Sequence, residues 1–239
     1  YHQQYLKTKS EKDAAITLEL YSDYVKVFPS GPNAYDMNFY HAEFLYQQKK
    51  RKEAANAYER ALDIKPDGEH TKDAAQGTVL AYKKLLQPKQ DSGDGKAEKA
   101  AGDAEVPKAE EIPEDYQRFL KAQALYIKYV KESEYLVDIK YDEARIYYEF
   151  NHFDQAAPRF QDICHKHADH RLAVFACNLL LDIQNLQKDY EAMHVEAKRC
   201  VGSSTAQRDP ELMKLCGDII KTYDFKKCQG QETEKKWIQ

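Results

Sequence analysis

The chain has 239 residues, of which 42% are hydrophobic and 32% are charged, and its formal net charge at pH 7 is −4. This balance is ordinary for a globular protein. Because Lys and Arg are dispersed among Asp and Glu, the sequence lacks the basic face expected of a nucleic-acid-binding protein. No apolar run approaches the roughly 18 residues that a membrane-spanning helix needs, so we expect no direct membrane span.

The chain contains only nine Gly and eight Pro, and no segment alternates apolar and polar residues over the length of a strand. We therefore predict an all-α fold. Within it, four positions at offsets 0, 4, 7 and 12 recur. The four copies are Thr17, Tyr21, Tyr24 and Pro29; Ala54, Tyr58, Ala61 and Pro66; Ala122, Tyr126, Tyr129 and Glu134; and Ala156, Phe160, Ile163 and Ala168.

The spacing has a physical reading. Offsets 0, 4 and 7 share one helical face, and a small residue at offset 0 lets a neighbouring helix approach closely. Proline at offset 12 ends the helix. Ala54 and Ala156 are 102 residues apart, which is three units of 34. Because Ala42 and Ala144 precede expected turns at 48–51 and 150–152, each unit reads as helix, turn, helix, which is typical of a helical repeat array.

This order of small and large positions resembles the tetratricopeptide repeat, most strongly in residues 35–68 and 137–170 and more weakly in 171–205. The resemblance implies a right-handed superhelical array of antiparallel helix pairs, with about five repeats. Asn38 and Lys140 depart from the pattern, because the family often has Trp there. Pro158 falls inside an expected helix and should kink it.

Residues 87–113 interrupt the pattern. They contain no aromatic residue, and Val106 and Ile112 are their only larger aliphatic residues, so they cannot bury enough apolar surface to offset the entropy of ordering. We predict N-terminal repeat helices in 1–86, a flexible acidic insertion in 87–113 that lies inside one repeat (helices at 71–86 and 114–131), and C-terminal helices in 114–239 that continue the same array. The alternative is a linker between two independent bundles.

In the resembled family, the first helices of successive repeats line a concave groove. Carried over to this chain, the groove positions are Asp36, Phe39, Glu43 and Tyr46 in one unit and Asp138, Tyr141, Arg145 and Tyr148 in another. Large aromatic side chains and Arg often dominate binding energy at interfaces, so we predict a protein or peptide partner here. The alternative is that the rings fill the core between helices. The acidic groups disfavour a clamp for a carboxylate and favour a mixed or basic partner.

The segment CHKHADH, residues 164–170, carries potential metal ligands in Cys164, His165, His167 and His170. Because consecutive helical positions point to different sides, we predict no metal site and no cofactor. The five cysteines show no paired spacing. Buried thiols are expected at Cys200 and Cys216, although one bridge such as Cys216 to Cys228 stays open.

The final eight residues, ETEKKWIQ, resemble the opening of another second helix after a first helix at 209–223, so we expect the native protein to extend beyond this chain. The sequence offers no nucleophile with a base and no phosphate-binding glycine loop, which predicts a non-catalytic scaffold.

Phe28, Pro29, Ser30, Pro32 and Ala34 resemble a turn common in bacterial cell-envelope repeat proteins. On that resemblance we expect a periplasmic component of an assembly, secretion or motility complex. A cytoplasmic co-chaperone-like adaptor and the recruitment arm of an enzyme are the alternatives.

Overall fold

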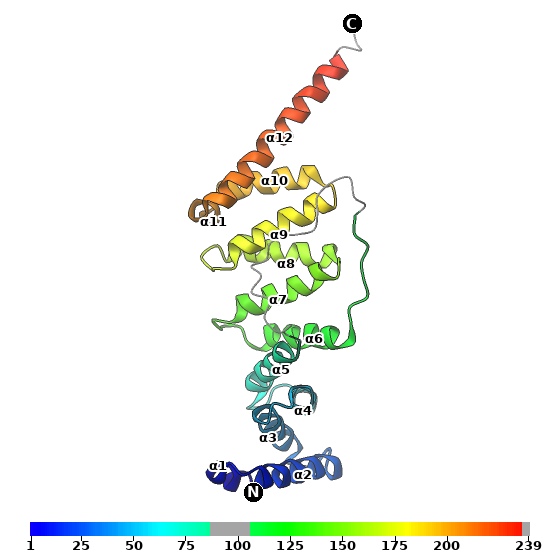
Figure 1. The fold of residues 1–239 in the computed structure, drawn as a ribbon, viewed down its shortest axis with the longest axis vertical. Coiled ribbons are helices and arrows are strands. Elements are labelled where there is room, and N and C mark those ends of the chain that lie inside the picture. Colours follow the sequence, from blue (N-terminus) through cyan, green and yellow to red (C-terminus); the bar gives the residue numbers. More distant parts are fainter. Residues whose placement is uncertain (87–105, 236–239) are drawn as a thin grey trace. The chain divides into compact units, whose positions relative to one another are not determined.

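The computed structural model describes residues 1–86 and 106–235, and every regular element within them is a helix, twelve in number (Figure 1). The all-α prediction is therefore confirmed for this part of the chain. The residues separate into two compact units. Unit 1 comprises Tyr1–Asp91 and Ile112–Ser133, and unit 2 comprises Ser92–Glu111 and Glu134–Gln239.

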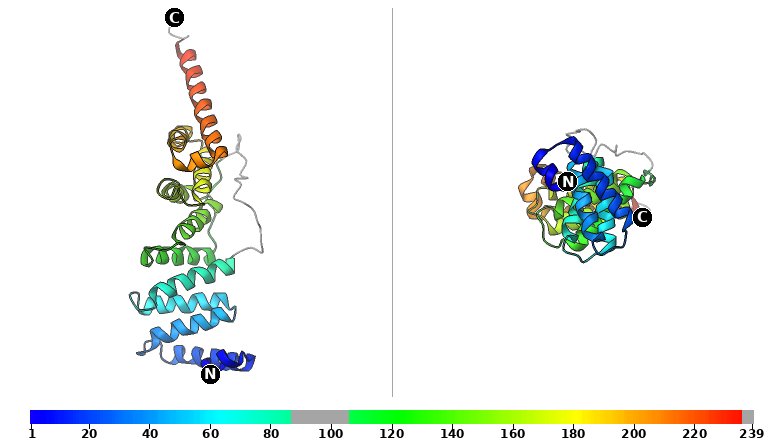
Figure 2. Two further views of the ribbon diagram at one scale, coloured as in Figure 1. Left: turned by 90° about the vertical axis from the view of Figure 1, so that its left-hand side faces the viewer. Right: turned by 90° about the horizontal axis from the view of Figure 1, so that it is seen from below.

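Unit 1 contains six helices: α1 His2–Thr8, α2 Glu11–Val27, α3 Ala34–Gln47, α4 Arg51–Ile64, α5 Thr71–Leu86 and α6 Glu114–Tyr129. Each helix packs against the next one in sequence, and Figure 2 lets the reader follow α2 to α5 as successive layers. Sequential packing of this kind is consistent with a helical repeat.

Unit 2 contains α7 Leu136–Glu149, α8 Phe153–Lys166, α9 Ala173–Leu186, α10 Tyr190–Val201, α11 Ser204–Arg208 and α12 Pro210–Lys235. From α7 to α10 the helices again pack in chain order, and α12 then packs on α10. The core of the unit is continuous from Tyr141 on α7 to Cys216 on α12.

The recurring positions mark the buried seam in both units. Ala54 and Ala156 are each the fourth residue of a helix and are both fully buried. Four residues later, Tyr58 packs on Phe39 with ring centroids 6.1 Å apart, and Phe160 packs on Tyr141 at 5.7 Å. For these two copies, the prediction that the offsets face a neighbouring helix is confirmed.

Three turns between paired helices share one backbone conformation. Lys49, Asn151 and Lys188 each have a positive φ, between 58° and 62°, just after the first helix of a pair. The following residue then closes the turn through its backbone N–H: Lys50 donates to Leu45 O, His152 to Tyr147 O, and Asp189 to Gln184 O. This is the Schellman ending of a helix, here built on residues other than glycine.

The expected start of a separate second helix near the C-terminus was wrong. Residues 232–235 do not open a new helix, because α12 runs without a break from Pro210 to Lys235. No proline follows Pro210, and the segment is rich in Lys, Gln and Glu, which favour helix. The short helix α11 was not predicted. Pro158 lies inside a helix as expected, and α8 continues past it to Lys166.

Residues 87–105 of the predicted insertion lie outside the described residues, and 106–113 have no regular secondary structure. The backbone N–H of Glu110 donates to Phe150 O at 2.9 Å, and the Asn151 side-chain amide donates to Lys108 O at 3.0 Å. This end of the predicted insertion is therefore held against the α7–α8 turn of its own unit. Continuation of one array through 114–239 stays a prediction.

Candidate functional site

In unit 1, the four predicted groove residues lie along one side of α3. Phe39 is buried and stacks on the His70 ring, with centroids 4.2 Å apart. Glu43 accepts a hydrogen bond from the Tyr58 hydroxyl. Asp36 lies 3.6 Å from His70 Nε2, and Tyr46 lies under the guanidinium of Arg51 at 3.9 Å.

The four corresponding residues in unit 2 are likewise buried or in contact with other side chains. Tyr141 and Tyr148 are both buried, and burial raises the pKa of Tyr141 to about 12. The Tyr148 hydroxyl donates to Asp182. Asp138 is paired with Arg171 and lies 3.3 Å from His170, while Arg145 forms an ion pair with Glu149 at 2.7 Å.

Three of the four predicted groove rings therefore fill the core between helices, which was the alternative raised by the sequence. The Tyr148 hydroxyl and the acidic groove residues contact other side chains of the same unit. These acidic residues are Asp36, Glu43 and Asp138. Asp36, Tyr46 and Arg145 keep partial exposure and are the groove residues most accessible to another molecule. Docking at these positions stays a prediction.

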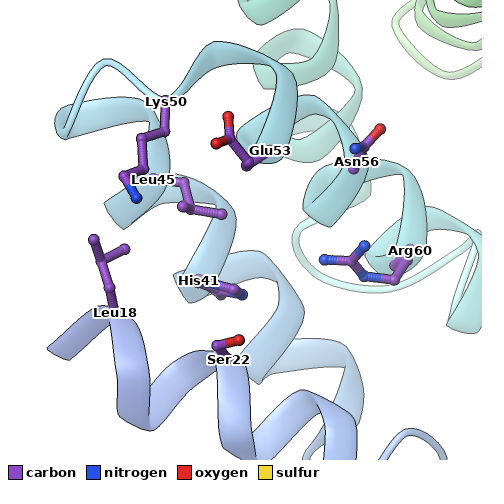
Figure 3. A pocket seen from close by; sticks show the side chains of 8 residues that line it. All are labelled: Leu18, Ser22, His41, Leu45, Lys50, Glu53, Asn56 and Arg60. Carbon is purple, nitrogen blue, oxygen red and sulfur yellow. The ribbon is translucent and has the colours of Figure 1, made fainter. Parts of the chain in front are cut away.

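A cavity of about 300 Å³ lies on the other side of α3. It lies between α2, α3 and α4, and Figure 3 shows side chains from all three helices facing it. Its lining comprises Leu18, Ser22, His41, Leu45, Lys50, Glu53, Asn56 and Arg60. His41 and Leu45 are separated from Phe39 and Glu43 around α3 because successive residues turn by about 100°.

His41 is the polar centre of this cavity. Its side chain is buried, with 7% exposed, and its Nδ1 has no hydrogen-bond partner among the described residues. Burial, reinforced by the nearby cations Arg60, Lys26 and Lys50, lowers the pKa of His41 to about 4. The imidazole is therefore neutral at pH 7, where it can donate one hydrogen bond and accept another.

The other polar groups give the cavity a net positive character. Lys50 and Arg60 outnumber the one acidic residue in the lining, Glu53. Arg60 Nε donates to Asn38 Oδ1 at 3.1 Å, which fixes the guanidinium beside α3. Asn56 adds a buried Oδ1 that also lacks a partner in the described part of the chain. Sequence reasoning missed this site because its residues share no motif and meet only when three helices pack.

The CHKHADH segment is split by the structure. Cys164 forms a disulfide with Cys177 of α9. His167 lies 4.0 Å from Asp162, and His170 faces Asp138, so neither histidine joins the other two residues. His165 instead pairs with Glu196 of α10, its Nε2 lying 2.5 Å from Oε1.

The remaining cysteines Cys200, Cys216 and Cys228 are free, and the first two are buried as expected. A Cys216–Cys228 bridge is not formed. The two residues lie 12 positions apart on one helix, a rise of about 18 Å, whereas a disulfide needs Cα atoms within about 7 Å.

No family model matches the chain, and a search of curated proteins finds no similar sequence. In the residues that the structure describes, no helix combines the length and the apolar character required to cross a bilayer.

Proposed function

We propose that the chain is a non-catalytic protein-interaction scaffold built from tetratricopeptide-like helix pairs. The 102-residue correspondence supports this reading, since it relates Ala54 to Ala156 in burial and position. The three identical turn conformations at Lys49, Asn151 and Lys188 support it as well. Stacked helix pairs of this kind present continuous helix faces to other polypeptides.

The observation that carries the proposal is the buried, neutral His41 facing the cavity between α2, α3 and α4. A buried polar atom without a partner is costly, and a bound group that hydrogen-bonds to it recovers that cost. Backbone amide and carbonyl groups of a polypeptide supply such donors and acceptors. The cavity volume of about 300 Å³ is at the lower end of the range for ligand pockets, which suits one side chain and its adjoining backbone.

The charged residues that line the cavity determine which peptides bind best. Lys50 and Arg60 favour an acidic side chain, and Glu53 at the same cavity disfavours a second one nearby. We therefore propose that unit 1 binds a short extended segment of a partner protein through one Asp or Glu. This site lies apart from the acidic positions Asp36 and Glu43, where a mixed or basic partner was predicted.

Selection from a displayed library of random peptides tests the proposal. Peptides enriched on the whole chain should carry an Asp or Glu at a fixed position, and Arg60→Gln should weaken their binding at least tenfold, about 1.4 kcal/mol. Asp63→Asn is the matched control, because Asp63 is an exposed residue on the same helix. Peptides that bind both variants equally, or that lack an acidic residue, would exclude this site.

We also propose a cell-envelope location. The Cys164–Cys177 disulfide supports it, since disulfides persist mainly in oxidising compartments. Quenching native cells in acid and alkylating the thiols under denaturing conditions tests the point, because both cysteines are buried in the folded protein. Cys164 and Cys177 should resist alkylation until a reductant is added, whereas alkylation without reductant would favour the cytoplasmic adaptor.

A further inference from the structure

Three potential metal ligands converge in unit 2. Cys164 and His165 lie in the last turn of α8, and Glu196 reaches them from α10. The Cys164 sulfur, a ring nitrogen of His165 and a carboxylate oxygen of Glu196 all lie within 4.8 Å of one another. All three residues line a cavity of about 230 Å³.

Glu196 makes this cluster unusual. Its side chain is 7% exposed, and a buried carboxylate is costly unless it is paired with a positive or hydrogen-bonding group. His165 provides that group, and its own side chain is only 13% exposed. A cation within reach of both groups would satisfy the same requirement more strongly, because the charge of a bound divalent ion dominates its surroundings.

A second sulfur borders the same cavity. Cys200 of α10 is free and buried, and it lies beside the Cys216 thiol of α12. The cavity lining thus includes two cysteines, one histidine and one glutamate, all residue types that bind zinc; Cys200 lies at the cavity but outside the group of three whose ligand atoms are within 4.8 Å of one another.

The disulfide determines whether Cys164 can act as a metal ligand. While Cys164 is bonded to Cys177, its sulfur carries no thiolate charge, and only a thiolate is a strong zinc ligand. We propose that reduction of the Cys164–Cys177 disulfide creates a binding site for Zn²⁺ or a similar thiophilic cation, with Cys164, His165 and Glu196 as ligands and Cys200 as the fourth donor.

The step is balanced by an external dithiol. Its two thiols transfer two electrons and two protons to the disulfide, so that the dithiol becomes a disulfide and Cys164 and Cys177 become thiols. The cation then displaces the thiol protons of Cys164 and Cys200. The oxidised protein is cross-linked and does not use this site, whereas the reduced protein gains the metal in place of the covalent link. Peptide binding by unit 1 is not required for this switch.

Cobalt titration of untagged full-length protein tests the proposal. Co²⁺ reports its ligands directly, since thiolate ligation produces a charge-transfer absorption in the near ultraviolet and tetrahedral geometry produces intense visible bands. Protein reduced with a phosphine should show both features at one Co²⁺ per chain, and Zn²⁺ should abolish them. Oxidised protein should show neither feature.

The variants separate a metal site from the effect of losing the cross-link. Cys177→Ser keeps Cys164 as a thiol and should bind Co²⁺ as the reduced protein does. Cys164→Ser should lose the charge-transfer band contributed by that sulfur and weaken binding at least about tenfold, and Glu196→Gln should weaken it similarly. Cys228→Ser is the control, because that thiol is exposed and lies outside the cavity lining.

Several results would contradict the metal-site proposal. The proposal fails when reduced protein gives no thiolate band, when oxidised protein binds Co²⁺ equally well, or when Cys164→Ser leaves the spectrum unchanged. Circular dichroism follows the fold in every sample. A reduced chain that loses helix and does not recover it with Zn²⁺ also overturns the proposal.

Discussion

Arg60 Nε on α4 donates a hydrogen bond to Asn38 Oδ1 on α3 at 3.1 Å. The same relationship recurs 102 residues later, where Lys140 Nζ on α7 contacts Asp162 Oδ2 on α8 at 2.9 Å. The acceptor and donor helices are exchanged between the two pairs, but the positions correspond. Asn38 and Lys140 are the two residues that depart from the tetratricopeptide pattern which this chain resembles. A polar side-chain contact therefore forms at the position where that family often has Trp.

Asp162→Asn should destabilise unit 2 in a pH-dependent manner. Burial alone would raise the Asp162 pKa, but hydrogen bonds from Lys166 and Lys140 outweigh it and lower the pKa. The resulting stabilisation is fully present above the unfolded-state pKa of about 3.9 and is lost as pH falls through the lower folded-state pKa. Urea unfolding should show a loss of about 1 kcal/mol at pH 7 that shrinks progressively as the pH falls below about 3.9.

Asp169→Asn is the matched control for that measurement. The Asp169 side chain is 96% exposed although it faces Arg208 at 3.4 Å. An exposed ion pair contributes little to the free energy of unfolding, so this variant should follow the wild-type curve. Equal effects of the two substitutions would contradict a structural role for the Lys140–Asp162 tie.

His41 should make unit 1 less stable as the pH falls from about 6.5 to 4. The folded-state pKa is about 4, so between these values the unfolded chain binds a proton that the folded chain does not. Stability therefore rises with pH across this window, by at most about 3 kcal/mol. His41→Gln removes the titrating group and should flatten the curve of unfolding free energy against pH. Titration of the His41 ring by NMR near pH 6.5 instead would contradict the assignment.

The repeat positions explain why much of the fold was predictable and the cavities were not. Helix boundaries around Ala54 and Ala156 follow from local spacing, because a 3.6-residue period identifies a buried face without knowledge of its partner. The Cys164–Cys177 disulfide depends on how α8 and α9 are rotated against each other. The His41 cavity likewise requires three packed helices. Such relations are tertiary and leave no local signal.

Lys188→Gly should stabilise unit 2. Lys188 has a φ of 58°, a left-handed conformation in which a Cβ atom is strained and glycine is not. We expect a gain of about 0.5 to 1 kcal/mol in the free energy of unfolding, measured in urea by circular dichroism. Asn151→Gly tests the reason, because Asn151 has the same conformation but also donates to Lys108 O and Glu110 Oε1. Losing those bonds should cancel or reverse the gain.

Gly77→Ala and Gly217→Ala should have opposite effects although both glycines lie inside helices. A Cβ atom at Gly77 would overlap the Tyr58 ring, which packs directly against α5, whereas at Gly217 it would meet nothing within 4 Å. Alanine favours helix over glycine by about 1 kcal/mol, so Gly217→Ala should stabilise the protein by about that amount. At Gly77 the overlap with a fully buried ring should outweigh this gain and cost about 1 to 3 kcal/mol overall. Urea unfolding of each variant against wild type measures both effects, and a stabilising Gly77→Ala would show that α5 and Tyr58 are not in close contact.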